Sequence, residues 1–223
     1  MVDELLILQD KVTVIPIENE PVGSNCYLCY NGDFSNDCFV VDPGAEDETF
    51  LIDSIKRNKL NLTYIILTHE HFDHCMGLNQ VRASFPNCKL VCSSECSDAI
   101  QQAKKNFSLY FRNPGFECGA ADVLLEDVDW ILHFGDLKIS FYPAQGHSKA
   151  GILFVVDNYV FTGDSLIKDI KTVTKLKTGS KEKLLDSINL LESWKGRGYI
   201  ICPGHGELFE LDNYDLSKAL GYF

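Results

Sequence analysis

Three of the six histidines in this 223-residue chain lie in one short run, His69-Glu70-His71-Phe72-Asp73-His74. The run follows the apolar segment Tyr64–Leu67, which has the pattern of a short buried strand, and α/β folds place ligands at the carboxyl ends of strands. Side chains at i and i+2 of an extended segment point to one side with Cα atoms about 6.5 Å apart, so His69 and His71 can reach one metal ion. Asp73 and His74 follow in the next turn, where they can serve a second ion. This concentration of ligand-type side chains predicts a metal site.

Three later segments place a histidine or an aspartate just beyond a predicted strand, with glycine beside it. They are His147 after Leu137–Tyr142, Asp164 after Tyr159–Phe161, and His205 after Tyr199–Cys202. Glycine at such a position permits close approach of the backbone. The three residues are far apart in the chain, so only the tertiary fold can assemble them. The remaining histidine, His133, lies in an apolar stretch and is predicted to be a packed structural residue.

The hydrophobic pattern predicts a layered α/β protein in which strand clusters alternate with helices. The predicted strands are Lys11–Ile17, Cys26–Tyr30, Cys38–Val41, Tyr64–Leu67, Lys89–Cys92, Leu137–Tyr142, Ile152–Val156, Tyr159–Phe161 and Tyr199–Cys202. Helical spacing of apolar residues predicts helices over Ala45–Asn58 and Lys181–Trp194, the second with Ser180 as its N-cap. Asn106–Val123 fits no regular element, and so long a loop is often functional. No repeat or linker-like stretch occurs, which predicts a single domain over residues 1–223.

Composition excludes several classes of protein. Hydrophobic residues make up 45% and charged residues 23%, an ordinary globular balance, and the formal net charge of −12 opposes binding to a nucleic-acid backbone. No apolar run approaches the ~18 residues that span a membrane. The acidic start Met1–Glu4 is unlike a signal peptide, and nine cysteines form an odd number that suits a reducing compartment. We therefore expect a cytoplasmic protein that binds neither nucleic acid nor a membrane.

The pair Cys26-x-x-Cys29 has the spacing of redox or zinc sites. On a strand, however, the two sulfurs face opposite sides, so we interpret both as core packing. Cys75, which adjoins His74, is interpreted in the same way.

The ordered set His69-x-His71-x-Asp73-His74, His147, Asp164 and His205 resembles the metallo-β-lactamase superfamily of metal-dependent hydrolases. Val41-Asp42-Pro43-Gly44 matches the first motif of that superfamily, an aspartate at a strand end behind the metal ligands. The resemblance extends from about Asn25 to His205 and implies an α+β fold, a four-layer αββα sandwich. It also implies that His69, His71 and His147 hold one metal, that Asp73, His74 and His205 hold the other, and that Asp164 bridges them.

Seven nitrogen and oxygen donors around two divalent ions leave room for a bridging water. The ions lower the pKa of that water towards about 7, which provides a hydroxide nucleophile at neutral pH. Imidazole and carboxylate ligands favour Zn, and they also suit Fe or Mn. The resemblance therefore implies a hydrolase acting on a small-molecule carbonyl compound, with Asp73 orienting the hydroxide and Asp164 holding both metals as catalytic residues. The sequence does not determine the oligomeric state.

Within the superfamily, the ligand run looks like the glyoxalase II branch, thioester hydrolases that act on glutathione conjugates. A thioester fits because a thiolate leaving group departs without a strong general acid. Three features depart from that branch: Gln145 precedes Gly146-His147 where proline is usual, Ser165–Lys171 replaces a stretch containing glycine and arginine, and no C-terminal helical domain is expected after His205. Three alternatives therefore remain. They are a persulfide dioxygenase with one iron on His69, His71 and His147, a lactone hydrolase, and a non-catalytic partner-binding module.

Two segments are candidates for the substrate pocket. Lysines after Asp164 either hold the carboxylates of a glutathione- or coenzyme A-like group or form a solvated surface; they are Lys168, Lys171, Lys175 and Lys177. Residues of the predicted loop either cover the site as an apolar lid or pack as simple core; they are Phe107, Tyr110, Phe111, Arg112 and Phe116.

Overall fold

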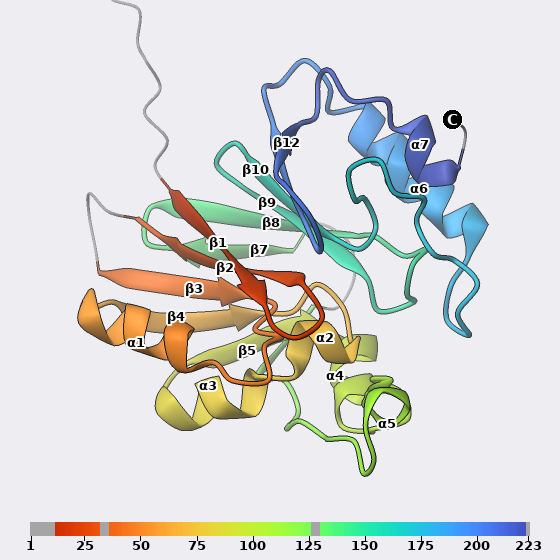
Figure 1. The fold of residues 1–223 in the computed structure, drawn as a ribbon. Coiled ribbons are helices and arrows are strands. Elements are labelled where there is room, and N and C mark those ends of the chain that lie inside the picture. The colour runs from red at the N-terminus through yellow and green to blue at the C-terminus, as the bar shows by residue number, and fades with distance from the viewer. Residues whose placement is uncertain (1–11, 32–35, 126–129, 222–223) are drawn as a thin grey trace, which may run out of the picture.

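The computed structural model describes residues 12–31, 36–125 and 130–221, and these form two six-stranded sheets packed face to face (Figure 1). The first sheet has the order β1-β2-β3-β4-β5-β6, with bounds Thr13–Asn19, Ser24–Tyr30, Asp37–Val41, Asn61–Ile66, Lys89–Ser93 and Val123–Leu125. The second has the order β12-β11-β10-β9-β8-β7; in chain order β7 to β12 are Ile131–Phe134, Leu137–Pro143, Ile152–Val156, Tyr159–Gly163, Ile200–Pro203 and Phe209–Glu210. Both sheets are mixed: β3 to β6 are parallel in the first, and β10 pairs parallel with β11 in the second.

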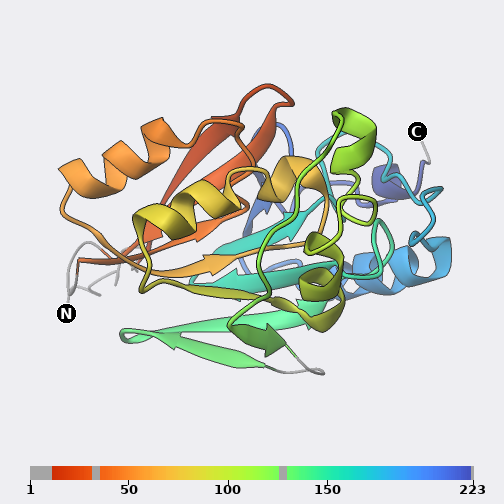
Figure 2. The same cartoon turned by 90° about the horizontal axis from the view of Figure 1, so that it is seen from below.

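Helices cover the two outer faces (Figures 1 and 2). The helices α1 to α5 follow strands of the first sheet and span Thr49–Arg57, Phe72–Cys75, Leu78–Ser84, Ser94–Ile100 and Ser108–Phe111. The helices on the second sheet are α6, Lys181–Glu192, and α7, Ser217–Leu220. The result is the predicted four-layer αββα sandwich, which confirms the fold class.

Three separate apolar clusters correspond to the three interfaces between these layers. The middle cluster joins the sheets through aromatic rings, with Tyr27 against Phe161 at 5.2 Å between ring centroids and Phe39 against Phe134 at 5.1 Å. Strand β3 is buried on both faces, so its sequence is a continuous apolar run rather than an alternating one. Cys26 packs in the outer cluster and Cys29 in the middle one, which confirms that their sulfurs lie on opposite faces of β2.

The predicted elements are found with shifted ends. Helix α1 begins at Thr49 instead of Ala45, because side chains before it hold a turn: Glu48 Oε1 accepts a hydrogen bond from the Ala45 N–H, and Asp47 Oδ1 accepts one from the Thr49 N–H. Ser180 caps α6 as predicted, accepting from the Lys183 N–H. Lys11 of the first predicted strand and Met1–Glu4 lie outside the described residues.

The prediction for His133 was wrong. This residue is exposed on β7, which is the edge strand of the second sheet and presents only one face to the core.

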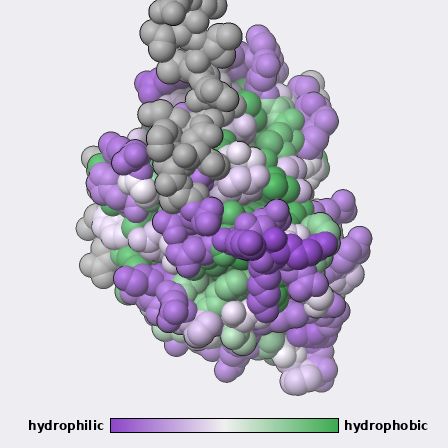
Figure 3. All heavy atoms as spheres, turned by 90° about the vertical axis from the view of Figure 1, so that its left-hand side faces the viewer, coloured by the Kyte–Doolittle hydropathy of each residue, from purple (hydrophilic) through white to green (hydrophobic). Residues whose placement is uncertain are grey.

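Cys75 is fully buried in the outer core, as its interpretation requires. No helix of the described chain is long and apolar enough to cross a bilayer. Viewed from the left-hand side of Figure 1, the surface is mainly polar with apolar side chains between (Figure 3).

Candidate metal centre

The predicted ligands converge where strands of both sheets end. His69, His71, Asp73 and His74 lie between β4 and the end of α2, and His147, Asp164 and His205 follow β8, β10 and β11. The two sheets are joined directly at this point, because the Asn25 N–H at the start of β2 donates to the Gly204 carbonyl at 2.7 Å. Seven side chains from four segments of the chain thus meet at one edge of the sandwich.

Six of these residues form two groups. In the first, His69, His71 and His147, one ring nitrogen from each lies within 4.8 Å of the others, and His147 Nε2 is 3.0 Å from His71 Nδ1. In the second, Asp73, His74 and His205 satisfy the same spacing. There His205 Nε2 lies 3.3 Å from Asp73 Oδ2, and His74 Nε2 lies 3.7 Å from the same oxygen.

Asp164 lies between the two groups. Its Oδ2 is 3.4 Å from His147 Nε2, and its Oδ1 is 3.4 Å from His74 Nε2 and 3.7 Å from His205 Nε2. One carboxylate oxygen therefore faces each group. The backbone opposite makes room for this carboxylate, since a Cβ on Gly204 would lie 2.1 Å from Asp164 Oδ1. The glycine beside His205 is therefore a steric requirement of the site.

Acceptors outside the centre orient four of the five rings. His147 Nδ1 lies 2.9 Å from the Val173 carbonyl and His205 Nδ1 lies 3.1 Å from the Gly23 carbonyl, so each Nδ1 carries the proton that it donates. This assignment leaves Nε2 of each ring with its lone pair towards the centre.

Asp42 and Thr68 orient His74 and His69 in the same way. Asp42 accepts hydrogen bonds from the Thr68 N–H at 2.7 Å and the Thr68 hydroxyl at 2.6 Å, and its Oδ2 is 3.1 Å from His74 Nδ1. Because the Thr68 hydroxyl donates to Asp42, it accepts from His69 Nδ1, 3.0 Å away. Asp42 is buried and both of its oxygens are occupied, so it supports the histidines rather than completing either group.

The donor set fits metal ions. His69 Nε2, His74 Nε2 and Asp164 Oδ1 are buried atoms without a hydrogen-bond partner among the described residues. A buried polar atom left unpaired costs free energy, and a cation satisfies lone pairs of this kind. Nitrogen and carboxylate oxygen are the ligand types that Zn and related divalent metals accept.

Electrostatics favour positive charge in the centre. Burial holds the pKa of His69 well below its ordinary value and lowers that of His71 to about 3, so both rings are neutral at pH 7. Burial alone would raise the pKa of Asp164, but His74 and the neighbouring imidazoles outweigh it and keep the carboxylate ionised. Burial opposes charge on His74, but the carboxylates of Asp73 and Asp164 raise its pKa. The surroundings of His74 therefore attract a cation, and protons compete with metal ions for this position.

A groove with a volume of about 520 Å³ adjoins the centre. It begins at Glu70 and Phe107 and is bordered by Lys104, Lys105, Lys149 and Lys177, and we call it the lysine groove. Phe107 contacts the centre directly, since its ring packs edge-on against His71 with centroids 4.9 Å apart.

The structure places only some residues of each pocket hypothesis at this groove. Of the four lysines after Asp164, Lys177 lines the groove, whereas Lys168 pairs with Glu207 at 2.5 Å. Of the loop aromatics, Phe107 and Tyr110 line the groove, while Phe111 stacks on Phe72 with centroids 4.6 Å apart. Sequence reasoning missed Lys104, Lys105 and Lys149; the adjacent pair Lys104-Lys105 just before the predicted loop is the signal that was available.

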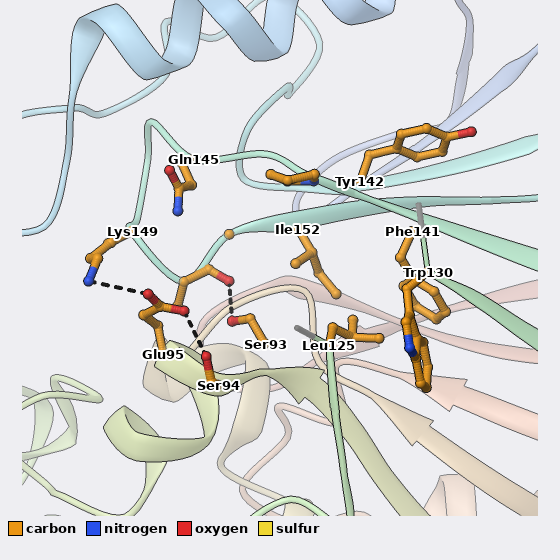
Figure 4. A pocket seen from close by; sticks show the side chains of 13 residues that line it. Ser93, Ser94, Glu95, Leu125, Trp130, Phe141, Tyr142, Gln145, Lys149 and Ile152 are labelled. Atoms are coloured by element: carbon orange, nitrogen blue, oxygen red, sulfur yellow. Dashed lines mark hydrogen bonds and ion pairs between the residues drawn. The ribbon is translucent and has the colours of Figure 1, made fainter. Parts of the chain in front are cut away.

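A second cavity, of about 390 Å³, lies beside the lysine groove (Figure 4). Trp130 and Phe141 form its apolar end, and the ion pair between Lys149 Nζ and Glu95 Oε1, 3.2 Å apart, forms its polar end. Both residues of this pair also line the lysine groove, so the ion pair separates the two spaces.

Comparison with known proteins agrees with this geometry. The family model of the metallo-beta-lactamase superfamily matches residues 19–205. The chain belongs to this superfamily. The chain is 26% identical to a probable metallo-hydrolase of Streptococcus pyogenes. The matched region covers 84% of this chain and 81% of the Streptococcus pyogenes protein. The chain is also 26% identical to the hydroxyacylglutathione hydrolase GloC of Haemophilus influenzae. That match covers 87% of this chain and 90% of GloC. Among solved structures, the BLEG-1 B3 metallo-beta-lactamase superposes with a TM-score of 0.81 at 29% identity, covering 89% of this chain and 94% of its own.

Proposed function

We propose that this metal-dependent hydrolase uses two metal ions, most suitably Zn, to hydrolyse a thioester. In this proposal His69, His71 and His147 would hold one ion, Asp73, His74 and His205 would hold the other, and Asp164 would be a ligand shared by both. The observation that carries the proposal is the position of Asp164, whose two oxygens face the two groups at 3.4 Å from His147 and from His74.

Two divalent ions in these groups would supply Lewis acidity towards a carbonyl oxygen and would acidify a water to a pKa of about 7. The residues of the chain supply the orientation. In this proposal Asp73, whose Oδ2 lies within 4 Å of two histidine nitrogens, would accept a hydrogen bond from the attacking water. Four of the five histidines are buried, all but His205, and this burial would keep bulk water away from the reacting groups.

The proton requirement of the leaving group favours a thioester substrate over an amide. Four of the five histidines have both ring nitrogens committed, one to an outer acceptor and one to the centre, so none of these four can protonate a leaving group. A thiolate departs without such a donor because the thiol pKa is about 8.5, whereas an amine must be protonated. The name of the Haemophilus influenzae relative, a hydroxyacylglutathione hydrolase, supports the same substrate class.

The test is thiol release from S-lactoylglutathione by zinc-loaded protein, with Asp164→Asn as the variant and the exposed Asp53→Asn as the matched control. We expect Asp164→Asn to lose about 100-fold or more in kcat/KM and to retain less metal, because it removes the ligand shared by both groups. Metal content is measured by mass spectrometry and folding by circular dichroism. Unchanged turnover and metal content in a folded Asp164→Asn protein would contradict the two-metal mechanism.

Three further substrates separate the alternatives. Turnover of a chromogenic cephalosporin faster than of S-lactoylglutathione would favour a β-lactamase, and preference for a lactone would favour a lactone hydrolase. Oxygen consumption with glutathione persulfide by iron-loaded protein would favour a persulfide dioxygenase that uses only His69, His71 and His147.

A further inference from the structure

We propose that the turn between β1 and β2, residues Asn19–Ser24, selectively positions the second group of ligands, which is Asp73, His74 and His205. The inference rests on the two-metal centre of the proposed function. It adds Asn19 and Ser24 as positioning residues, which belong to neither group of ligands. Figure 1 shows this turn beside α2, the helix that carries two of the three ligands. Binding of the second ion should depend on the turn, whereas binding of the first should not.

Ser24 anchors the backbone of Asp73. The Ser24 side chain is fully buried, and its hydroxyl donates a hydrogen bond to the Asp73 carbonyl at 2.5 Å. Helix α2 spans only Phe72–Cys75, and a single helical turn is too short to hold its own conformation. The helical partner expected for the Asp73 carbonyl is the Gly77 N–H, but this group donates to the Pro43 carbonyl at 3.0 Å. The position of Asp73 therefore depends on the hydrogen bond from Ser24.

Asn19 connects the turn to Asp42, the residue that orients His74. Asn19 is 1% exposed, and its Nδ2 donates to Ser24 Oγ at 2.8 Å and to the Asp42 carbonyl at 3.1 Å. One amide thus joins the support of Asp73 to the support of His74. The Asn19 Oδ1 is buried without a partner among the described residues, which costs free energy. The two bonds that Nδ2 donates are therefore what favours asparagine at this position.

The turn also holds His205, the third ligand of the group. The Gly23 carbonyl accepts from His205 Nδ1 at 3.1 Å, and Ser24 forms an isolated β-bridge with His205. The Gly23 N–H donates to the Asn19 carbonyl at 2.8 Å, which closes the turn. A change in the turn would therefore move the acceptor that fixes the tautomer and the direction of the His205 ring.

The turn, the loop that carries Asp42 and helix α2 meet without space between them. A Cβ on Gly44 of that loop would lie 1.7 Å from the Asp73 carbonyl oxygen and 2.9 Å from Asn19 Nδ2. Segments packed this closely transmit a displacement instead of absorbing it. A shift of the turn is therefore passed on to Asp73 and to Asp42.

The first group of ligands is held by other segments of the chain. Within the described residues, the turn forms no hydrogen bond with His69, His71 or His147. The Val173 carbonyl accepts from His147 Nδ1 at 2.9 Å, and the Phe107 ring packs edge-on against His71. Both contacts come from loops far from the turn in sequence, one after β10 and the other after α4.

Asp42 also reaches His69, but through a residue with an anchor of its own. The Thr68 hydroxyl donates to Asp42 at 2.6 Å and accepts from His69 Nδ1 at 3.0 Å. The Thr68 carbonyl accepts separately from the Ile152 N–H at 2.9 Å, at the start of β9 in the second sheet. Thr68 and His69 are therefore held in place when the turn shifts.

The test titrates metal-free protein with Zn against a competing chelator and obtains a dissociation constant for each ion. Ser24→Ala and Asn19→Ala each remove one anchor of the turn. Ser97→Ala is the matched control, because it also removes a buried hydroxyl bonded to the backbone, in α4, where Ser97 Oγ accepts from the Ala121 N–H at 3.0 Å.

Two reference variants assign the binding steps. His71→Ala removes a ligand of the first group and His205→Ala removes a ligand of the second, so each variant identifies the step that it abolishes. Circular dichroism and urea unfolding of the metal-free proteins establish that the variants fold. If either Ser24→Ala or Asn19→Ala does not fold, the other one decides.

We expect Ser24→Ala and Asn19→Ala to weaken the step that His205→Ala abolishes by about 10-fold or more, as is typical for residues that orient metal ligands, and to change the other step by less than about 2-fold. Ser97→Ala should change neither step. A residue with a merely structural role would alter both steps together, so the difference between the two steps is the informative result.

Equal weakening of both steps, or of neither, in a folded turn variant would overturn the inference, and so would the same selective change in Ser97→Ala. The titration uses no substrate, so these outcomes leave the proposed thioester hydrolysis standing. A wild-type protein that binds a single Zn ion would instead contradict the two-metal centre itself, and the inference with it.

Discussion

Glu48 is a buried carboxyl group without a cation beside it, and this makes the stability of the protein depend on pH. Only 2% of its surface is exposed, and no described lysine, arginine or histidine lies within 4.0 Å of its carboxylate. Burial raises the pKa of Glu48 to about 7, with the hydrogen bond from the Ala45 N–H opposing the rise only in part. The folded protein therefore keeps a proton that the unfolded chain releases near pH 4.5.

The sign and size of the effect follow from this difference. A raised carboxyl pKa contributes no penalty below pH 4.5, costs stability as the pH rises from 4.5 to about 7, and reaches a constant cost above that. The full cost is about 3 kcal/mol, and the part that develops between pH 5 and pH 8 is about 2.5 kcal/mol. In Glu48→Gln the amide oxygen still accepts from Ala45, but no ionisation remains. The variant should therefore gain stability relative to wild type as the pH rises.

Urea unfolding of metal-free wild type and Glu48→Gln at pH 5, 6, 7 and 8 measures the effect. The difference in unfolding free energy between the two proteins should change by about 2.5 kcal/mol in favour of the variant from pH 5 to pH 8. The exposed Glu117→Gln serves as the control and should follow the wild-type curve. A Glu48→Gln difference that stays constant within about 0.5 kcal/mol across this range, well below the predicted 2.5 kcal/mol, would refute the reasoning.

Two further predictions concern the support of the site. Asp42→Asn replaces an acceptor of the His74 Nδ1 proton by a weaker one, so metal affinity should fall about 10- to 100-fold in chelator competition, and unchanged affinity would show that Asp42 does not orient His74. Asn106→Ala removes hydrogen bonds at both ends of a fully buried side chain, so unfolding free energy should fall by about 2 to 3 kcal/mol in urea titration. The Phe107 backbone, which has a φ of +63°, should then relax from its strained conformation, and a fall of less than about 0.5 kcal/mol would show that Asn106 is not what holds it.

The ion pair between Lys149 and Glu95 gives the groove a second boundary. It is largely exposed, with side-chain exposures of 65% and 40%, and exposed pairs contribute little to stability. The ion pair therefore matters less for stability than for its position, since both of its residues line the lysine groove and the second cavity (Figure 4). A ligand longer than the lysine groove would meet this pair before it reached Trp130.

The sequence by itself predicted the class of fold, which is confirmed, and named the seven residues that the structure brings together in the candidate metal centre. The ligand run His69–His74 lies in one short stretch of sequence directly after one strand. Metal binding requires histidine and carboxylate side chains close together, and this spacing is visible in the sequence without the fold. The apolar run Cys38–Val41 was predicted as a strand, and the structure shows that this strand, β3, is buried on both faces, which explains why it has no polar side. Short helices such as α3 and α4 were not predicted, because seven residues carry too little periodicity to separate helix from loop.

Only the tertiary structure decided which side chains surround the reacting groups. Lys104, Lys105 and Lys177 converge although more than 70 residues separate the pair from the third, and no local pattern encodes that distance. His133 is exposed because β7 lies at a sheet edge, a property of strand order rather than of its neighbours in sequence. The tautomers of the histidines likewise depend on acceptors such as the Val173 and Gly23 carbonyls, which the fold brings from distant segments. Residue type and spacing therefore predict candidate metal ligands. The charge around these ligands, the exposure of side chains and the orientation of the histidine rings depend on contacts that exist only after folding.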